Sequence, residues 1–273
     1  MPNSPRYSFI VIERLTNLGE EALSARLRLL ADLGYGGVEL QLAHPFGIGL
    51  DRLEHLLASH GLVVPSFLTG EAYSDGLCLS SPYPNIRRAT VDRLIGYLPT
   101  VKRFNAIMVV GLLQGRLSDE ANVDVALARI ENGLKYVVEA AEKAQVDVVV
   151  EPVNHLQVGF HNSVGEVRAL IARIGSPALR PMVDTLHMNI EEGSLTDPIR
   201  ACGAELRHVH LCESHGGRFG TGRVDFPSVL GTLQRIAFRE WCSVKVYRRL
   251  AFNEAAESSI NFLRSAAPKP AHS

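Results

Sequence analysis

Four apolar stretches in the C-terminal half of the chain end at or beside a polar residue. They read VDVVVE (146–151), LRPMVD (179–184), LRHVHL (206–211) and WCSVKV (241–246). Nearly continuous runs of this kind are typical of parallel strands that are buried on both faces. Four similar runs precede them, namely YSFIVI (7–12), GGVEL (36–40), LVVPSFL (62–68) and AIMVVG (106–111), so the sequence predicts eight strands.

Amphipathic segments separate these runs. In the segment 20–33, Leu23, Leu27 and Leu30 recur at helical spacing, and Gly34 is a suitable C-terminal cap. The segments 122–143, 163–174, 226–238 and 253–263 show the same behaviour. Eight strand–helix units in about 250 residues predict an α/β protein with a (β/α)8 TIM barrel. We expect a single domain over residues 1–273, with a flexible tail over 265–273.

A doubly wound open sheet is the alternative architecture. It usually carries a glycine-rich turn after its first strand, and ERLTNLG (13–19) matches that turn poorly. The barrel is therefore the preferred prediction. The long, turn-rich loop 69–85 after the third strand suits a lid over an active site.

The composition favours a protein that binds small molecules. The chain has 273 residues, 46% hydrophobic and 21% charged, with a formal net charge of -1. Its Lys and Arg residues are scattered, which gives no broad surface for nucleic acid or an anionic membrane. No apolar stretch approaches the roughly 20 residues that span a bilayer, and the N-terminus lacks the features of a signal peptide. We expect a cytoplasmic protein whose four cysteines are reduced core residues.

Polar side chains converge at the ends of the last four strands. Side chains alternate along a strand, so one face of each run includes Glu151, His208 with His210, and Ser243 with Lys245. In a barrel, chemistry belongs at the C-terminal ends of the strands. The alternation therefore predicts that Glu151, His210 and Lys245 point into one cavity.

Three of the strand-end residues have the chemistry of metal ligands. Glu151, Asp184 and His210 offer carboxylate oxygens and an imidazole nitrogen, which suit Mn²⁺, Mg²⁺, Co²⁺ or Zn²⁺. His187, three residues after Asp184, can reach the same cavity to bind substrate or to support the ligands. For each residue alone, the competing interpretation is a hydrogen-bonded core side chain or, for His187, a surface histidine.

Several motifs carry a family resemblance over nearly the whole chain. GYGGVELQ (34–41), VVVEPVNH (148–155), PMVDTLHMNIEEGS (181–194), LRHVHLCES (206–214) and GTGRVDF (220–226) resemble the xylose-isomerase-like TIM barrels. That family includes ketose 3-epimerases, hydroxypyruvate isomerases and, more distantly, AP endonucleases. The resemblance implies an isomerase or epimerase that acts on a small polyhydroxy carbonyl compound by proton transfer through an enediolate. It also implies metal-ligand roles for Glu151, Asp184 and His210, a substrate contact for His187, and Glu151 as the catalytic base.

The chain departs from the family pattern at two positions. Gln157 stands where the epimerases have a substrate-binding glutamate, and it can still bind hydroxyls. Lys245 stands where the family has a second metal-binding glutamate, so we expect a lower affinity for divalent ions. Arg218 resembles the family's substrate-binding arginine. Glu39 is expected either to bind a substrate hydroxyl or to fill the mouth of the barrel.

Three interpretations of Lys245 remain open from the sequence. Its ammonium group takes the metal position and polarises a substrate carbonyl; or a metal stays and Lys245, with a depressed pKa, acts as an acid or base opposite Glu151; or the protein is a non-catalytic ligand-binding or partner subunit. A Schiff-base lyase is a further alternative. An AP endonuclease needs more strand-end histidines than SFLTG (66–70) and MVVGLL (108–113) provide. Assembly into a homo-oligomer is left open.

Overall fold

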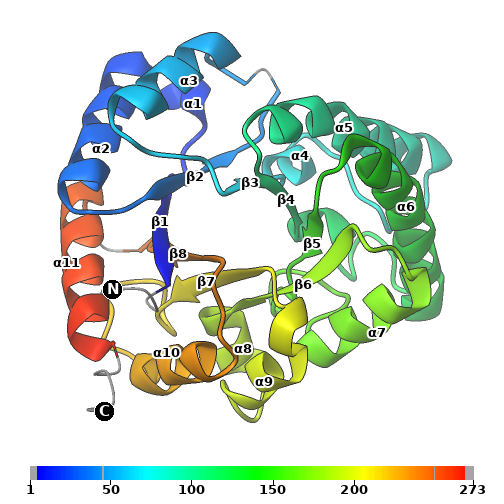
Figure 1. Ribbon diagram of the computed structural model, residues 1–273. Helices are drawn as coiled ribbons and strands as arrows, with labels where there is room; N and C mark the ends of the chain where they lie inside the picture. Colours follow the sequence, from blue (N-terminus) through cyan, green and yellow to red (C-terminus); the bar gives the residue numbers. More distant parts are fainter. Residues whose placement is uncertain (1–4, 45, 249, 268–273) are drawn as a thin grey trace.

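Eight parallel strands close into a barrel in the computed structural model, which describes residues 5–44, 46–248 and 250–267. Figure 1 shows the strands as a ring with the helices outside it. Direct pairing of the first and last strands, with Phe9 opposite Val244, closes the ring and excludes the open sheet. The predicted TIM barrel is confirmed. The strands are β1 (Arg6–Ile10), β2 (Gly37–Gln41), β3 (Ser66–Leu68), β4 (Ile107–Val110), β5 (Val148–Val150), β6 (Leu179–Asp184), β7 (His208–Cys212) and β8 (Trp241–Lys245).

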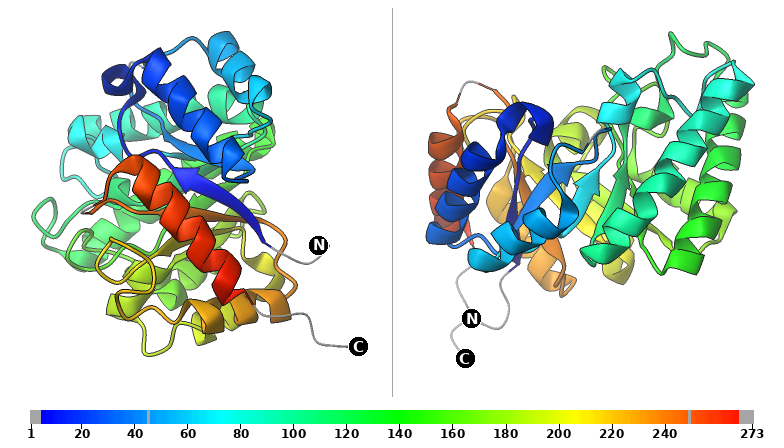
Figure 2. Two further views of the ribbon diagram at one scale, coloured as in Figure 1. Left: turned by 90° about the vertical axis from the view of Figure 1, so that its left-hand side faces the viewer. Right: turned by 90° about the horizontal axis from the view of Figure 1, so that it is seen from above.

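The five helices expected from periodicity are present, with ends shifted by a few residues. Among the described residues, the α-helices are α1 (Leu15–Leu18), α2 (Glu20–Asp32), α3 (Leu50–Ser59), α4 (Glu71–Ser74), α5 (Pro84–Arg103), α6 (Val123–Ala144), α7 (Val164–Ile174), α8 (Thr185–Glu191), α9 (Asp197–Cys202), α10 (Phe226–Arg235) and α11 (Phe252–Ala266). Two short 3-10 turns are η1 (Leu112–Gln114) and η2 (Gly203–Glu205). The helices α2 and α11 lie side by side in Figures 1 and 2, so the two ends of the helical layer meet.

The last helix reaches further than the periodicity predicted. It continues to Ala266 and so takes in the first residues of the expected tail, while 268–273 lie outside the described residues. Within the described part of the chain, no helix combines the length and apolar character needed to cross a bilayer. The four cysteines are free and buried, as expected.

Strand alternation separates an outer core from the barrel interior. Val148 and Val150 on β5 belong to the large core between strands and helices. Val149, between them, packs inside the barrel with Ile107 and Met182. The predicted orientation of this strand is therefore correct, and it directs the next residue of the same parity, Glu151, toward the barrel axis.

The loop 69–85 forms a fixed wall instead of a free lid. Its first residues, Thr69 and Gly70, line a cavity, but Leu79 and Ser80 are fully buried. The Leu79 amide donates to the Leu113 carbonyl at 2.8 Å, which ties the loop to η1. Buried apolar contacts and a backbone bond of this kind oppose the opening that a lid requires.

A short hydrogen-bonded chain holds the end of β5. The Gln114 side-chain amide donates to the backbone carbonyl of Glu151 at 3.2 Å. His161 Nδ1 in turn lies 2.9 Å from Gln114 Oε1, and both side chains are buried. Because a carbonyl oxygen only accepts, His161 carries a proton on Nδ1. The backbone at Glu151 is thus fixed from both sides, since its amide also donates to Val110 at 2.9 Å.

We predict that Gly115→Ala lowers the free energy of unfolding by roughly 2–4 kcal/mol. Gly115 has φ +99°, and an added Cβ would overlap Ser80 Oγ and Cys78 Sγ. Urea denaturation of the variant beside Gly193→Ala measures the effect, because Gly193 is exposed and has open space around it. A loss as small as that of the Gly193 variant would contradict the packing described for this wall.

We also predict that the protein loses stability in mild acid, because His161 is buried. Burial lowers the pKa of His161 from 6.5 to about 4. Between pH 6.5 and pH 4, His161 therefore binds a proton in the unfolded chain but not in the folded chain. The free energy of unfolding is at its full value above pH 6.5 and decreases as the pH falls toward 4. The loss amounts to about 3 kcal/mol. Denaturation at several pH values should show a shallower acid slope in His161→Asn; an equal slope would refute this assignment.

Candidate active site

A cavity of about 230 Å³ opens at the C-terminal ends of the strands. Much of its wall is apolar, with side chains from β1, β3, β4 and the η1 turn. The ionisable groups in the wall stand together on one side, and a few amides complete the polar surface. The polar residues are Gln41, Thr69, Glu151, Gln157, His187, His210 and Lys245, and Tyr247 also lines the cavity. A small, mostly apolar cavity with a few convergent polar groups is typical of a ligand site.

Lys245 lies at the centre of the polar side. Its Nζ atom is 2.7 Å from Asp184 Oδ2, 3.4 Å from Glu151 Oε1 and 3.4 Å from His187 Nε2. The Lys245 side chain is 19% exposed, whereas the Asp184 carboxylate is fully buried. The structure therefore brings together the residues that the sequence placed at the ends of strands five, six and eight.

Lys245, Glu151 and Asp184 stabilise one another in their charged forms. Burial raises the pKa of the Glu151 carboxyl, but the Lys245 and His210 charges overcome it and lower that pKa to about 2. Burial opposes ionisation of Asp184 too, and the Lys245 charge holds the pKa of Asp184 well below its usual value. For Lys245, the two carboxylates outweigh burial and raise its pKa well above 10.5. This is the opposite of the depressed pKa required if Lys245 acted as a base or as a Schiff-base nucleophile.

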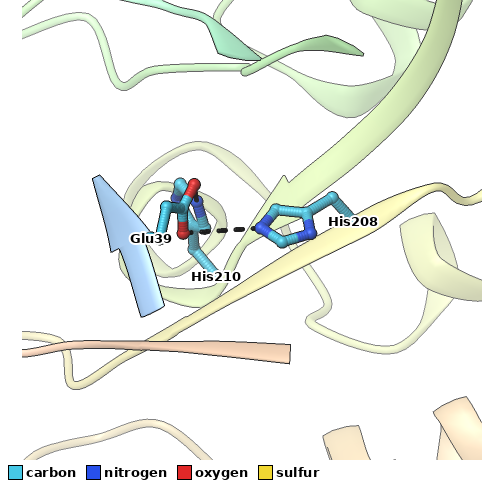
Figure 3. Close-up of side chains that lie close together, drawn as sticks. All are labelled: Glu39, His208 and His210. Atoms are coloured by element: carbon cyan, nitrogen blue, oxygen red, sulfur yellow. Dashed lines mark hydrogen bonds and ion pairs between the residues drawn. The ribbon is translucent and has the colours of Figure 1, made fainter. Parts of the chain in front are cut away.

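His210 bridges this ion pair to a second buried carboxylate. Its Nδ1 lies 2.9 Å from Glu151 Oε1, and its Nε2 lies 3.1 Å from Glu39 Oε1. Burial lowers the pKa of His210, but Glu39 and Glu151 together raise it well above 6.5, so both ring nitrogens donate. Glu39 thus lies beneath the cavity floor, against His210 and, at 3.5 Å, His208 (Figure 3). Fully buried and absent from the cavity wall, it has no surface to offer to a substrate hydroxyl.

His187 is held as a neutral hydrogen-bond donor. Asn154 Oδ1 accepts the Leu156 amide at 3.1 Å, which leaves the Asn154 NH₂ group to donate to His187 Nδ1 at 2.7 Å. The ring proton is therefore assigned to Nε2, which faces the cavity. Burial lowers the pKa of His187, in agreement with a neutral ring.

Of the two other expected substrate contacts, Gln157 lies in the cavity wall and Arg218 lies outside it. Gln157 lines the cavity, as the sequence predicted for its position. Arg218 does not: its guanidinium pairs with Glu254 on α11, the side chain is 44% exposed, and it is not part of the cavity wall. The loop after β7 carries it outward, where the arginine reaches α11 instead of the strand ends.

Sequence reasoning missed two polar groups at the site. Asn154 is buried behind His187, and Gln41 lies in the cavity wall with its Oε1 unpaired among the described atoms. Gln41 follows Glu39 by two residues, so alternation puts both on the same face of β2. Alternation could therefore have pointed to Gln41, but it does not tell which of the two residues reaches the cavity.

Carboxylate and imidazole groups that can bind a metal ion are present, but Lys245 occupies the place between them. The ligand atoms of Glu151, Asp184 and His187 lie within 4.8 Å of one another. A divalent ion bound to these oxygens would lie about 3 Å from the ammonium nitrogen, with a repulsion on the order of 10 kcal/mol at an effective dielectric constant of 20. As arranged, these residues do not fit a resident divalent ion.

Comparisons with known proteins agree with this architecture. The chain is 28% identical over 220 residues to a ketose 3-epimerase of Arthrobacter globiformis, covering 80% of this chain and 75% of that protein. It is 30% identical to an L-ribulose 3-epimerase of Methylomonas sp., covering 77% and 73%. It is 25% identical to a hydroxypyruvate isomerase of Escherichia coli, covering 82% and 87%.

Solved structures share the same barrel. The D-allulose 3-epimerase of Methylomonas sp., in complex with D-allulose, superposes with a TM-score of 0.84 at 21% identity, over 97% of this chain and 98% of that one. Residues 27–266 match the family described as Xylose isomerase-like TIM barrel. The chain belongs to the xylose isomerase-like TIM barrel family.

Proposed function

We propose that this protein is a sugar isomerase or epimerase that moves a proton on a carbon next to a carbonyl group of a small polyhydroxy compound. One observation carries the proposal: an ionised, buried carboxylate, Glu151, faces a small cavity beside a fixed positive charge. The relatives that act as ketose 3-epimerases, L-ribulose 3-epimerase and hydroxypyruvate isomerase support this class of reaction.

Glu151 is the base in this proposal. It is the one carboxylate in the cavity wall among the described residues, because Asp184 and Glu39 are fully buried behind it. Its Oε1 atom is engaged by His210 and Lys245, whereas no hydrogen bond to Oε2 is described for this part of the chain. Oε2 lies near Gly111, whose missing side chain keeps that side of the carboxylate open: an added Cβ would approach Oε2 to 2.8 Å. A substrate C–H bond can reach the carboxylate there.

The other cavity groups bind and orient the substrate. His187 Nε2–H donates to an oxygen beside the reacting carbon, and Gln41 and Gln157 offer amides to hydroxyl groups. The apolar wall excludes water, which strengthens each of these polar contacts and protects the enediolate.

Isomerisation needs fewer groups than epimerisation. A single carboxylate can take a proton from one carbon and return it to the neighbouring carbon on the same face, which converts an aldose to a ketose. Inversion at one carbon needs an acid on the opposite face, whereas the Lys245 ammonium group lies on the same side as Glu151, 3.4 Å from its Oε1 atom. The position at which solvent hydrogen enters the product separates the two outcomes.

A non-catalytic role is the second candidate. It is favoured by the low pKa of Glu151, which makes the resting carboxylate a weak base. A substrate oxygen that binds Lys245 and becomes negatively charged would share the ammonium charge and restore part of the basicity of Glu151. A binding subunit would show ligand affinity without any hydrogen exchange.

We predict that the protein catalyses exchange of a substrate α-hydrogen with solvent deuterium in a panel of aldoses and ketoses. Glu151→Gln should lower the exchange rate about 10²–10⁴-fold, because the amide cannot accept the proton. Glu139→Gln is the matched control, since Glu139 is exposed on α6 and pairs with Lys143. Proton NMR follows the exchange. Full activity in Glu151→Gln, or no exchange with any substrate with or without divalent ions, would sink the proposal.

A further inference from the structure

We propose that Lys245 is the built-in cation of this active site: its ammonium group takes the place of a divalent ion, binds the substrate carbonyl oxygen, and makes the protein independent of metal. The catalytic half of this inference rests on the proposed function. The statement that the site holds an ammonium group in place of a metal stands on the geometry alone.

The position of the ammonium group is the first argument. Lys245 reaches inward from the end of β8, Asp184 from the end of β6, and Glu151 follows β5 directly. Its Nζ atom contacts both carboxylates and lies 3.4 Å from His187 Nε2. These are the same three groups whose ligand atoms gather within 4.8 Å of one another. The ammonium nitrogen thus lies where those oxygens would hold an ion.

The fixed orientation of Asp184 is the second argument. Its Oδ1 atom caps α8 by accepting the amides of Leu186 at 2.8 Å and His187 at 3.3 Å. Only Oδ2 remains for a cation, and Lys245 donates to it at 2.7 Å. A metal ion would therefore have to displace the Lys245 ammonium group from the Asp184 carboxylate, which cannot turn away. The displaced ammonium group would lose its buried partner, which is strongly unfavourable.

Hydrogen-bond capacity is the third argument. An ammonium group has three N–H donors, and the two carboxylates use two of them. His187 Nε2 does not accept the third, because the Asn154 contact assigns a proton to that nitrogen. One Lys245 N–H and the His187 Nε2–H are thus both available to a ligand oxygen in the cavity. Such paired donors are suited to an oxygen that becomes negatively charged.

The reaction balances without a metal or a redox partner. Glu151 takes the proton from the carbon next to the carbonyl, the C–H electrons form the C=C bond, and the carbonyl π electrons move to its oxygen. Lys245 and His187 stabilise that oxyanion through their N–H groups. In isomerisation, the proton of the neighbouring hydroxyl then passes to this oxygen, and Glu151 returns its proton to the former carbonyl carbon.

The first arm of the test measures metal binding without reference to activity. We expect wild-type protein purified without chelator to hold no stoichiometric metal, and its melting temperature to be unchanged by Mn²⁺, Co²⁺ or EDTA. Lys245→Glu should bind Mn²⁺ and melt at a higher temperature when it is added, because a third carboxylate replaces the cation. Lys143→Glu, an exposed change on α6 with the same effect on net charge, should behave as wild type. Stoichiometric, stabilising metal in wild-type protein would overturn the inference.

The second arm measures catalysis. Hydrogen exchange by wild-type protein should stay within twofold when EDTA is added, and Lys245→Met should lower it about 10²–10³-fold. Lys245→Arg, which keeps the charge, serves as a second variant if Lys245→Met does not fold. Exchange that EDTA abolishes refutes the inference and leaves the proposed function standing. Absence of exchange under every condition refutes the proposed function, and the metal titration then decides the placement of the ammonium group by itself.

Discussion

The contact between the Lys245 ammonium group and Asp184 Oδ2, at 2.7 Å, is the interaction on which the rest of the site depends. A barrel that buries Glu39, Glu151 and Asp184 around one axis needs positive charge among them, since uncompensated buried carboxylates are very unfavourable. Lys245 supplies one charge and His210 the other. This compensation is local, and it leaves Glu151 ionised at the cavity wall.

Each side chain in this network is placed by the backbone of a different strand end. Asp184 is fixed because it also caps α8. Glu151 is fixed because the Gln114 side chain, held in turn by His161, donates a hydrogen bond to its backbone carbonyl group. Glu39, from β2, pairs with His210, and Figure 3 shows these two side chains together with His208. Rigid placement of this kind keeps reacting groups oriented before substrate arrives.

Strand periodicity allowed most of this site to be predicted from the sequence. Runs of buried residues predicted the eight strands, and the alternation of side chains along them predicted that Glu151, His210 and Lys245 point into one cavity. In the structure all three line that cavity. Parity does not give depth, however. Glu39 and Gln41 share a face, and only the three-dimensional barrel shows that Gln41 reaches the cavity while Glu39 stays below it.

Loops and charge states required the structure. Arg218 lies in a loop without periodicity, and its pairing with Glu254 of the distant α11 follows from no local pattern. The direction of the Lys245 pKa shift depends on distances to two carboxylates more than 60 positions away in sequence. Sequence alone therefore left three interpretations of Lys245 open, and geometry favours the ammonium group as the resident cation.

Anomalous diffraction from crystals grown with Mn²⁺ tests this central claim most directly. The account predicts no anomalous peak between Glu151 and Asp184, with the Lys245 side chain directed at Asp184 Oδ2 as described. A strong anomalous peak at that position, with Lys245 turned out of the cavity, would contradict it.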